Sequence, residues 1–119
     1  MSDTQSDFLL AAMFPALAAE LQELLVAEGR QDLADQVPGL KIVDRCRCGD
    51  DFCATIYTRP RPRGAWGPGH ECIPLDPKVP GMIILDTVDG AIAEVEILDR
   101  GDIRKVLLAA LPDLPAEKT

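Results

Sequence analysis

Apolar residues recur at steps of three and four residues in the first quarter of the chain, and the pattern then changes to alternation. The first pattern predicts an N-terminal helix with one buried face. Pro15 should kink this helix or begin its main part. A short second helix is predicted over residues 30–37, where Pro38-Gly39 stops it. The apolar positions of the first helix are Leu10, Phe14, Leu17, Leu21, Leu24 and Leu25.

Residues 40–58 predict a first hairpin, because an alternating segment is interrupted by Gly49-Asp50. A two-residue turn there would place Cys46 opposite Cys53. Side chains alternate between the two faces of a strand, so Cys46, Cys48 and Cys53 would then share one face. A shift of the turn by one residue would separate them.

Residues 81–99 predict a second hairpin more clearly, since Asp89-Gly90 is the strongest short hairpin signal. Counting outward from that turn pairs Ile84 with Val95 and Met82 with Ile97 on an apolar face. Glu94 and Glu96 would point to the other face, opposite Leu85 and Ile83.

The remaining segments complete an α+β fold. Residues 59–69 are rich in proline and glycine and predict an exposed loop. Residues 71–76 predict a short strand that Pro74 confines to an edge of the sheet. A last helix should begin near Asp99 or Gly101 and end at Pro112. We therefore expect a single domain over residues 1–119: an antiparallel sheet of about five strands, made of two hairpins and a short edge strand, packed by an N-terminal and a C-terminal helix.

Length, charge and the first residues bear on the number of domains, the binding partners and the cellular location. The chain has 119 residues, enough for one domain with its own core. Its net charge of −8 disfavours binding to nucleic acid or to an anionic membrane surface. The first residues lack the basic region of a signal peptide, so we expect a cytoplasmic protein, in which cysteines are thiols or metal ligands.

The four cysteines and the only histidine lie between residues 46 and 72. Thiolate and imidazole are preferred ligands of zinc, and a hairpin that gathers three thiols needs little rearrangement to bind it. The alternative is that the protein has no cofactor and the cysteines are small reduced core residues. The predicted zinc ligands are Cys46, Cys48 and Cys53, with His70 or Cys72 completing the set.

The loop after the first hairpin alternates arginine with proline, which favours an extended backbone with outward guanidinium groups. Arginine and tryptophan often anchor protein interfaces. The predicted partner-binding residues are therefore Arg59, Arg61, Arg63 and Trp66. The alternative is that the arginines pair with the protein's own acids while Trp66 folds back on the sheet.

Two further patterns could carry chemistry, but the sequence supports that interpretation less well. Acidic residues in and around the second hairpin are typical of the solvated face of a sheet, although they could meet a basic partner or a hard cation. His70 and Cys72 lie two residues apart and could form a thiol–imidazole pair on one face of a strand, but no third orienting group can be named. We predict no catalytic residue, and the enzyme interpretation is the weaker one. The acidic residues are Asp86, Asp89, Glu94, Glu96 and Asp99.

The segments CRCGDDFCATIYT and IILDTVDGAIAEVEIL resemble small uncharacterised bacterial proteins that carry a Cys-x-Cys-Gly hairpin before a second hairpin. The strand–Asp-Gly–strand element ending in EIL is also similar to the closing hairpin of a bacterial domain-of-unknown-function family. The resemblance implies a bacterial α+β protein without an assigned activity. It carries over no catalytic or binding residue.

Two functions fit these observations. The first is a non-catalytic protein-interaction module that binds another protein, as immunity proteins, antitoxins and regulators do, and acts as a monomer or a homodimer. The alternative is a small zinc-binding protein that uses the cysteines together with His70.

Overall fold

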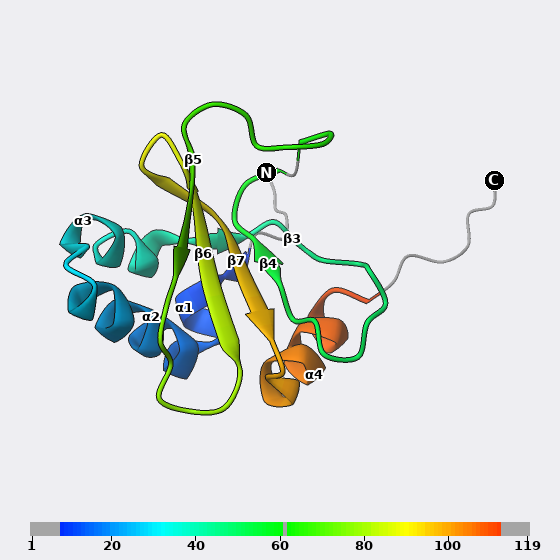
Figure 1. Cartoon of the computed structure of the whole chain (residues 1–119). Helices are drawn as coiled ribbons and strands as arrows, with labels where there is room; N and C mark the ends of the chain where they lie inside the picture. Colours follow the sequence, from blue (N-terminus) through cyan, green and yellow to red (C-terminus); the bar gives the residue numbers. More distant parts are fainter. Residues whose placement is uncertain (1–7, 61, 113–119) are drawn as a thin grey trace, which may run out of the picture.

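The computed structural model describes residues 8–60 and 62–112, and its centre is a five-stranded antiparallel sheet. The strand order is β3-β4-β7-β6-β5 (Figure 1). A second, two-stranded sheet pairs β1 with β2. The expected α+β architecture is therefore confirmed. The strands are β1 (Phe8–Leu9), β2 (Lys41–Ile42), β3 (Asp44–Arg45), β4 (Ile56–Tyr57), β5 (His70–Pro74), β6 (Met82–Val88) and β7 (Ala91–Leu98).

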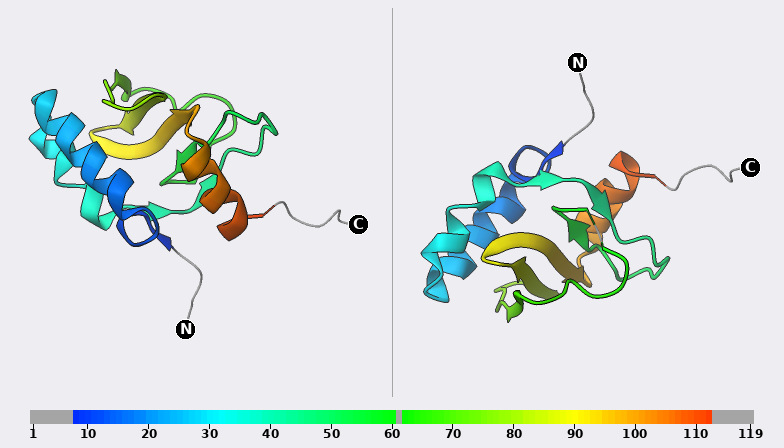
Figure 2. Two further views of the ribbon diagram at one scale, coloured as in Figure 1. Left: turned by 90° about the horizontal axis from the view of Figure 1, so that it is seen from below. Right: turned by 90° about the horizontal axis from the view of Figure 1, so that it is seen from above.

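The helices lie against one face of the five-stranded sheet, and the segment between β4 and β5 crosses the other face (Figure 2). We call the face without helices the outer face. Pro15 begins the longest helix, as expected, because a first helical residue needs no N–H donor. Among residues 8–60 and 62–112, no helix combines the length and the apolar character that a membrane crossing requires. The helices are α1 (Leu10–Met13), α2 (Pro15–Ala27), α3 (Gln31–Ala34), the 3₁₀ turn η1 (Val37–Gly39) and α4 (Gly101–Ala110).

The turn of the second hairpin forms at Asp89-Gly90, as predicted, and both residues have positive φ angles of 51° and 84°. Positive φ at both central residues is the signature of a type I′ turn. Next to the turn, Val88 pairs with Ala91 and Thr87 with Ile92.

The predicted register of this hairpin is wrong beyond the turn. A bulge between Asp86 and Thr87 shifts the pairing, so that Leu85 lies opposite Val95 and Ile83 opposite Ile97. These apolar pairs are fully buried, whereas Met82 is 48% exposed. The extra residue on β7 is Ala93, which has no partner on β6. The shift also places Asp86 opposite Glu94.

The predicted register of the first hairpin is also wrong. Arg45 pairs with Ile56, and the backbone N–H of Cys46 donates to Thr55 O rather than facing Cys53. Cys53 instead forms a bridge with Leu98 of β7. The chain after residue 51 therefore takes its register from pairing with β7. This pairing places Ile56 opposite Val95, and both side chains are buried in the core. Residues 46–53 form a loop instead of two strands joined by a tight turn.

The edge strand is confirmed. β5 pairs with β6 alone, and Cys72 lies directly opposite Asp86. Because side chains alternate, burial of Ile73 against the helices sends Cys72 to the outer face. The outer face thus carries Cys72 of β5 together with acidic side chains of β6 and β7.

Candidate metal-binding site

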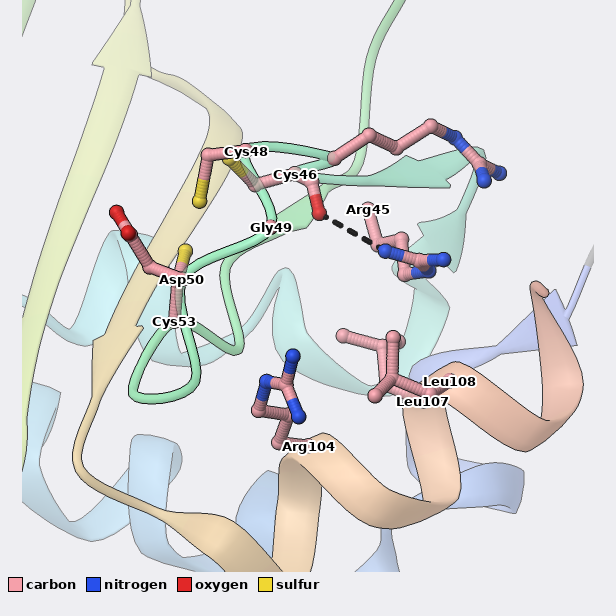
Figure 3. A pocket seen from close by; sticks show the side chains of 10 residues that line it. Arg45, Cys46, Cys48, Gly49, Asp50, Cys53, Arg104, Leu107 and Leu108 are labelled. Carbon is pink, nitrogen blue, oxygen red and sulfur yellow. Dashed lines mark hydrogen bonds between the residues drawn. The ribbon is translucent and has the colours of Figure 1, made fainter. Parts of the chain in front are cut away.

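Cys46, Cys48 and Cys53 come together at the end of the sheet beside α4 (Figure 3), and we call them the thiol cluster. Their sulfur atoms lie within 4.8 Å of one another. Cys46 follows directly after β3, while Cys48 and Cys53 belong to the loop. Gly49 has a φ of 84°, a conformation that favours glycine and lets the chain reverse after Cys48. The predicted convergence of the three thiols therefore occurs, although through a loop.

The thiols of this cluster differ in acidity. Burial, together with hydrogen bonds from its thiol to Cys48 and Cys53, raises the pKa of Cys46 to about 11. Burial also acts on Cys53, but hydrogen bonds from the Thr55 side chain and backbone and from the other two thiols outweigh it and lower the pKa of Cys53. Of Cys46 and Cys53, Cys53 therefore becomes a thiolate more readily.

Arginine side chains border the thiol cluster. Arg45 is 5% exposed; its Nη1 donates to Cys46 O at 3.1 Å and its Nε donates to Leu111 O at 2.5 Å. Arg104 of α4 lies across a hollow of about 210 Å³ that the three thiols also line. We call residues 46–53 the thiol loop; the guanidinium of Arg45 joins the start of this loop to the end of α4.

His70 and Cys72, the other predicted ligands, do not join the thiol cluster. Cys72 instead forms a group with Asp86 and Glu96, whose ligand atoms lie within 4.8 Å of one another. We call Cys72, Asp86 and Glu96 the carboxylate cluster. His70 Nε2 lies 2.7 Å from Asp86 Oδ1. The five predicted metal ligands are therefore divided between two places.

Asp86 and Glu96 are the site residues that sequence reasoning missed, because both were interpreted as part of a solvated face. Asp86 is only 3% exposed, so that interpretation is wrong for it. Contact with Asp86, followed by burial and the charges of Asp86, Glu94 and Cys53, raises the pKa of Glu96 to about 8. The spacing of three between apolar Ile92 and Val95 was an available signal, since it breaks strict alternation and indicates a bulge.

Cys72 is poorly suited to act as a nucleophile. Burial raises its pKa, and the carboxylates of Asp86, Glu96 and Glu94 raise it further. The Nε2 atom of His70 contacts Asp86 Oδ1. The raised pKa of Cys72 disfavours the thiolate that a thiol–imidazole pair would require.

The loop between β4 and β5 covers part of the outer face. Trp66 Nε1 donates to Glu94 Oε1 at 3.1 Å, so Trp66 folds back on the sheet. Arg59 and Arg63 are exposed, and Arg61 lies outside the described residues. Between loop and sheet is a hollow of about 290 Å³, lined by Tyr57, Pro62, Gly64, Trp66, His70, Asp86, Glu94 and Glu96.

Comparison with protein-family models, with curated proteins and with solved structures finds no match to this chain.

Proposed function

We propose that this protein binds a thiophilic metal ion, zinc, through Cys46, Cys48 and Cys53. The observation that carries the proposal is the mutual approach of the three sulfur atoms to within 4.8 Å. Zinc–thiolate bonds of about 2.3 Å in a tetrahedral site require sulfur atoms about 3.8 Å apart. Small rotations of the side chains would therefore complete the site without refolding the loop.

The chemistry of the donor set supports a borderline or soft ion. Three thiolates favour zinc or copper(I) over magnesium or calcium, which require oxygen ligands. The lowered pKa of Cys53 provides a first thiolate, and binding would displace the remaining thiol protons. The fourth zinc ligand would come from solvent or from a molecule in the adjoining hollow.

The test is cysteine alkylation resolved by residue. Reduced, metal-free protein is treated with iodoacetamide with and without zinc, and modification of each cysteine is measured by peptide mass spectrometry. Zinc should protect Cys46, Cys48 and Cys53 together, at one equivalent per chain for this site. Equal reactivity of these three thiols with and without zinc would show that the proposal is wrong.

A matched variant sharpens this test. Cys48→Ser removes one proposed ligand at an exposed position and should abolish zinc protection of Cys46 and Cys53. Cys72→Ser removes a thiol outside the thiol cluster and should leave that protection unchanged. Circular dichroism of both variants checks that the fold is retained.

A second candidate function, binding of a protein with an acidic surface, is favoured by the loop arginines. Trp66 is held on the sheet by its contact with Glu94, and Arg59 and Arg63 are exposed in a chain of net charge −8. Exposed arginines of this kind suit recognition of carboxylates. We expect Arg59→Glu combined with Arg63→Glu to abolish recovery of a specific partner from host extract, whereas Lys105→Glu on α4 should not. Recovery of the same proteins by all three forms would exclude this role for the loop.

A further inference from the structure

The carboxylate cluster is left unused by the proposed three-thiolate site, with which it shares no residue. Its members come from three neighbouring strands: Cys72 from β5, Asp86 from β6 and Glu96 from β7. The pairing of Cys72 with Asp86, and of Asp86 with Glu94, brings these positions side by side on the outer face. Rigid strands hold the three donors, so their mutual approach does not depend on a loop.

One oxygen of the buried Asp86 carboxylate, Oδ2, has no partner among the described residues as long as the neighbouring Glu96 is ionised. Asp86 is 3% exposed, and its Oδ2 is buried without a hydrogen-bond donor among the described residues. Burying a carboxylate oxygen without a hydrogen-bond donor or a cation beside it is strongly unfavourable. The same residue lines the hollow under the loop, so a cation entering there would reach it.

The surroundings also orient the cluster. His70 Nε2 contacts Asp86 Oδ1 at 2.7 Å and leaves Oδ2 as the oxygen that requires a partner. Carboxylates that bind metal ions are themselves hydrogen-bonded by neighbouring groups, which fixes their direction.

We propose that Cys72, Asp86 and Glu96 bind a second divalent cation of the zinc class, held by one thiolate and two carboxylates on the outer face of the sheet. The mixed sulfur and oxygen set suits zinc, whereas an all-oxygen set would suit magnesium or calcium. His70 is a positioning residue that acts through Asp86. A proton shared between Asp86 and Glu96 is the competing occupant, and the experiment separates the two.

The experiment measures zinc protection of Cys72 in the variant that combines Cys46→Ser, Cys48→Ser and Cys53→Ser. This variant lacks the proposed three-thiolate site, so any zinc that protects Cys72 from iodoacetamide must be held elsewhere. We expect protection at one equivalent of zinc, lost on adding Asp86→Asn and kept with Asp76→Asn, an exposed control. His70→Ala should weaken zinc binding by about 10- to 100-fold, as loss of an outer-shell contact does.

Alkylation of Cys72 that is the same with and without zinc would overturn the proposal and leave the shared proton as the occupant. Protection that survives Asp86→Asn would overturn it as well. If the triple variant fails to fold, the same readout applies to the otherwise wild-type chain, because modification of Cys72 is measured separately from that of the other cysteines. Failure of the thiol cluster to bind zinc would not affect this result, so either proposal can be overturned without the other.

Discussion

At the scale of single residues, the thiols of the thiol cluster share one loop but differ in their protonation. Hydrogen bonds supplied by Thr55 and by the other thiols favour the thiolate of Cys53, whereas the raised pKa of the half-buried Cys46 favours its thiol form. Nucleophilicity toward alkylating reagents belongs to the thiolate. Within this loop the Cys46 thiol therefore donates a hydrogen bond, and the Cys53 sulfur accepts one.

We expect Cys53 to react with iodoacetamide faster than Cys46 in metal-free protein at neutral pH. Thr55→Val should slow Cys53, because the variant removes the hydroxyl that stabilises its thiolate. Thr58→Val, which loses a hydroxyl bonded to Ile92 O, is the matched control and should leave Cys53 unchanged. Rates from residue-resolved mass spectrometry check this; a Cys53 rate that Thr55→Val does not alter would contradict it.

Glu96 predicts a pH-dependent stability in metal-free protein. Its pKa rises from 4.5 to about 8 on folding, so the folded state holds a proton that the unfolded state releases between these values. The free energy of unfolding should therefore decrease as pH rises from about 4.5 to about 8, with no further loss from this group above that range. Urea unfolding with a chelator measures the slope, which Glu96→Gln should reduce. An equal slope in both proteins would rule out Glu96 as its source.

At the scale of elements, the Asp89-Gly90 turn and the bulge at Ala93 together set the register that forms the carboxylate cluster. Gly90 has a φ of 84°, a conformation that costs other residues about 1–2 kcal/mol. Gly90→Ala should lower the free energy of unfolding by about that amount, although a Cβ there meets no atom within 4 Å. Gly101→Ala, at ordinary φ and equally open, should not destabilise the protein. Urea denaturation of both variants distinguishes backbone strain from crowding.

The elements also explain which parts of the structure the sequence could predict. The Asp89-Gly90 turn, the edge strand and the helix starting at Pro15 follow from local chemistry, and all were predictable. The register of β6 was not, because Met82 to Leu85 are all apolar and either alternate set could face the core. The first hairpin failed for a different reason: pairing of Cys53 with Leu98 is a long-range choice that overrides the turn signal of Gly49.

The two candidate sites also differ in how well the sequence could predict them. The approach of Cys46, Cys48 and Cys53 was predicted from a hairpin register that is wrong; the three thiols come together because they lie in and beside one short loop. The carboxylate cluster was not predicted, because its members are joined only by pairing across three strands and by a bulge at Ala93. His70 or Cys72 was predicted to complete the thiol set, whereas both belong to β5, which lies at the opposite edge of the sheet from β3.

At the scale of the whole molecule, metal binding should stabilise the fold. The thiol loop is tied to β7 through Cys53 and to the end of α4 through Arg45, so an ion bound there favours the folded arrangement of both. At a free zinc concentration about 100-fold above the Kd, the free energy of unfolding should rise by about 2.7 kcal/mol for one site. Calorimetry with zinc and with chelator measures this rise. The triple serine variant should lose the part that comes from the thiol cluster.

The contact between Trp66 and Glu94 makes the fluorescence of Trp66 a reporter of the outer face. The chain has a single tryptophan, and its indole N–H donates to a carboxylate that lines the same hollow as Asp86 and Glu96. A change of charge in that hollow alters the electric field at the indole ring. The intrinsic fluorescence of the unlabelled protein should therefore change when a cation enters the outer face, and this signal can be followed in real time.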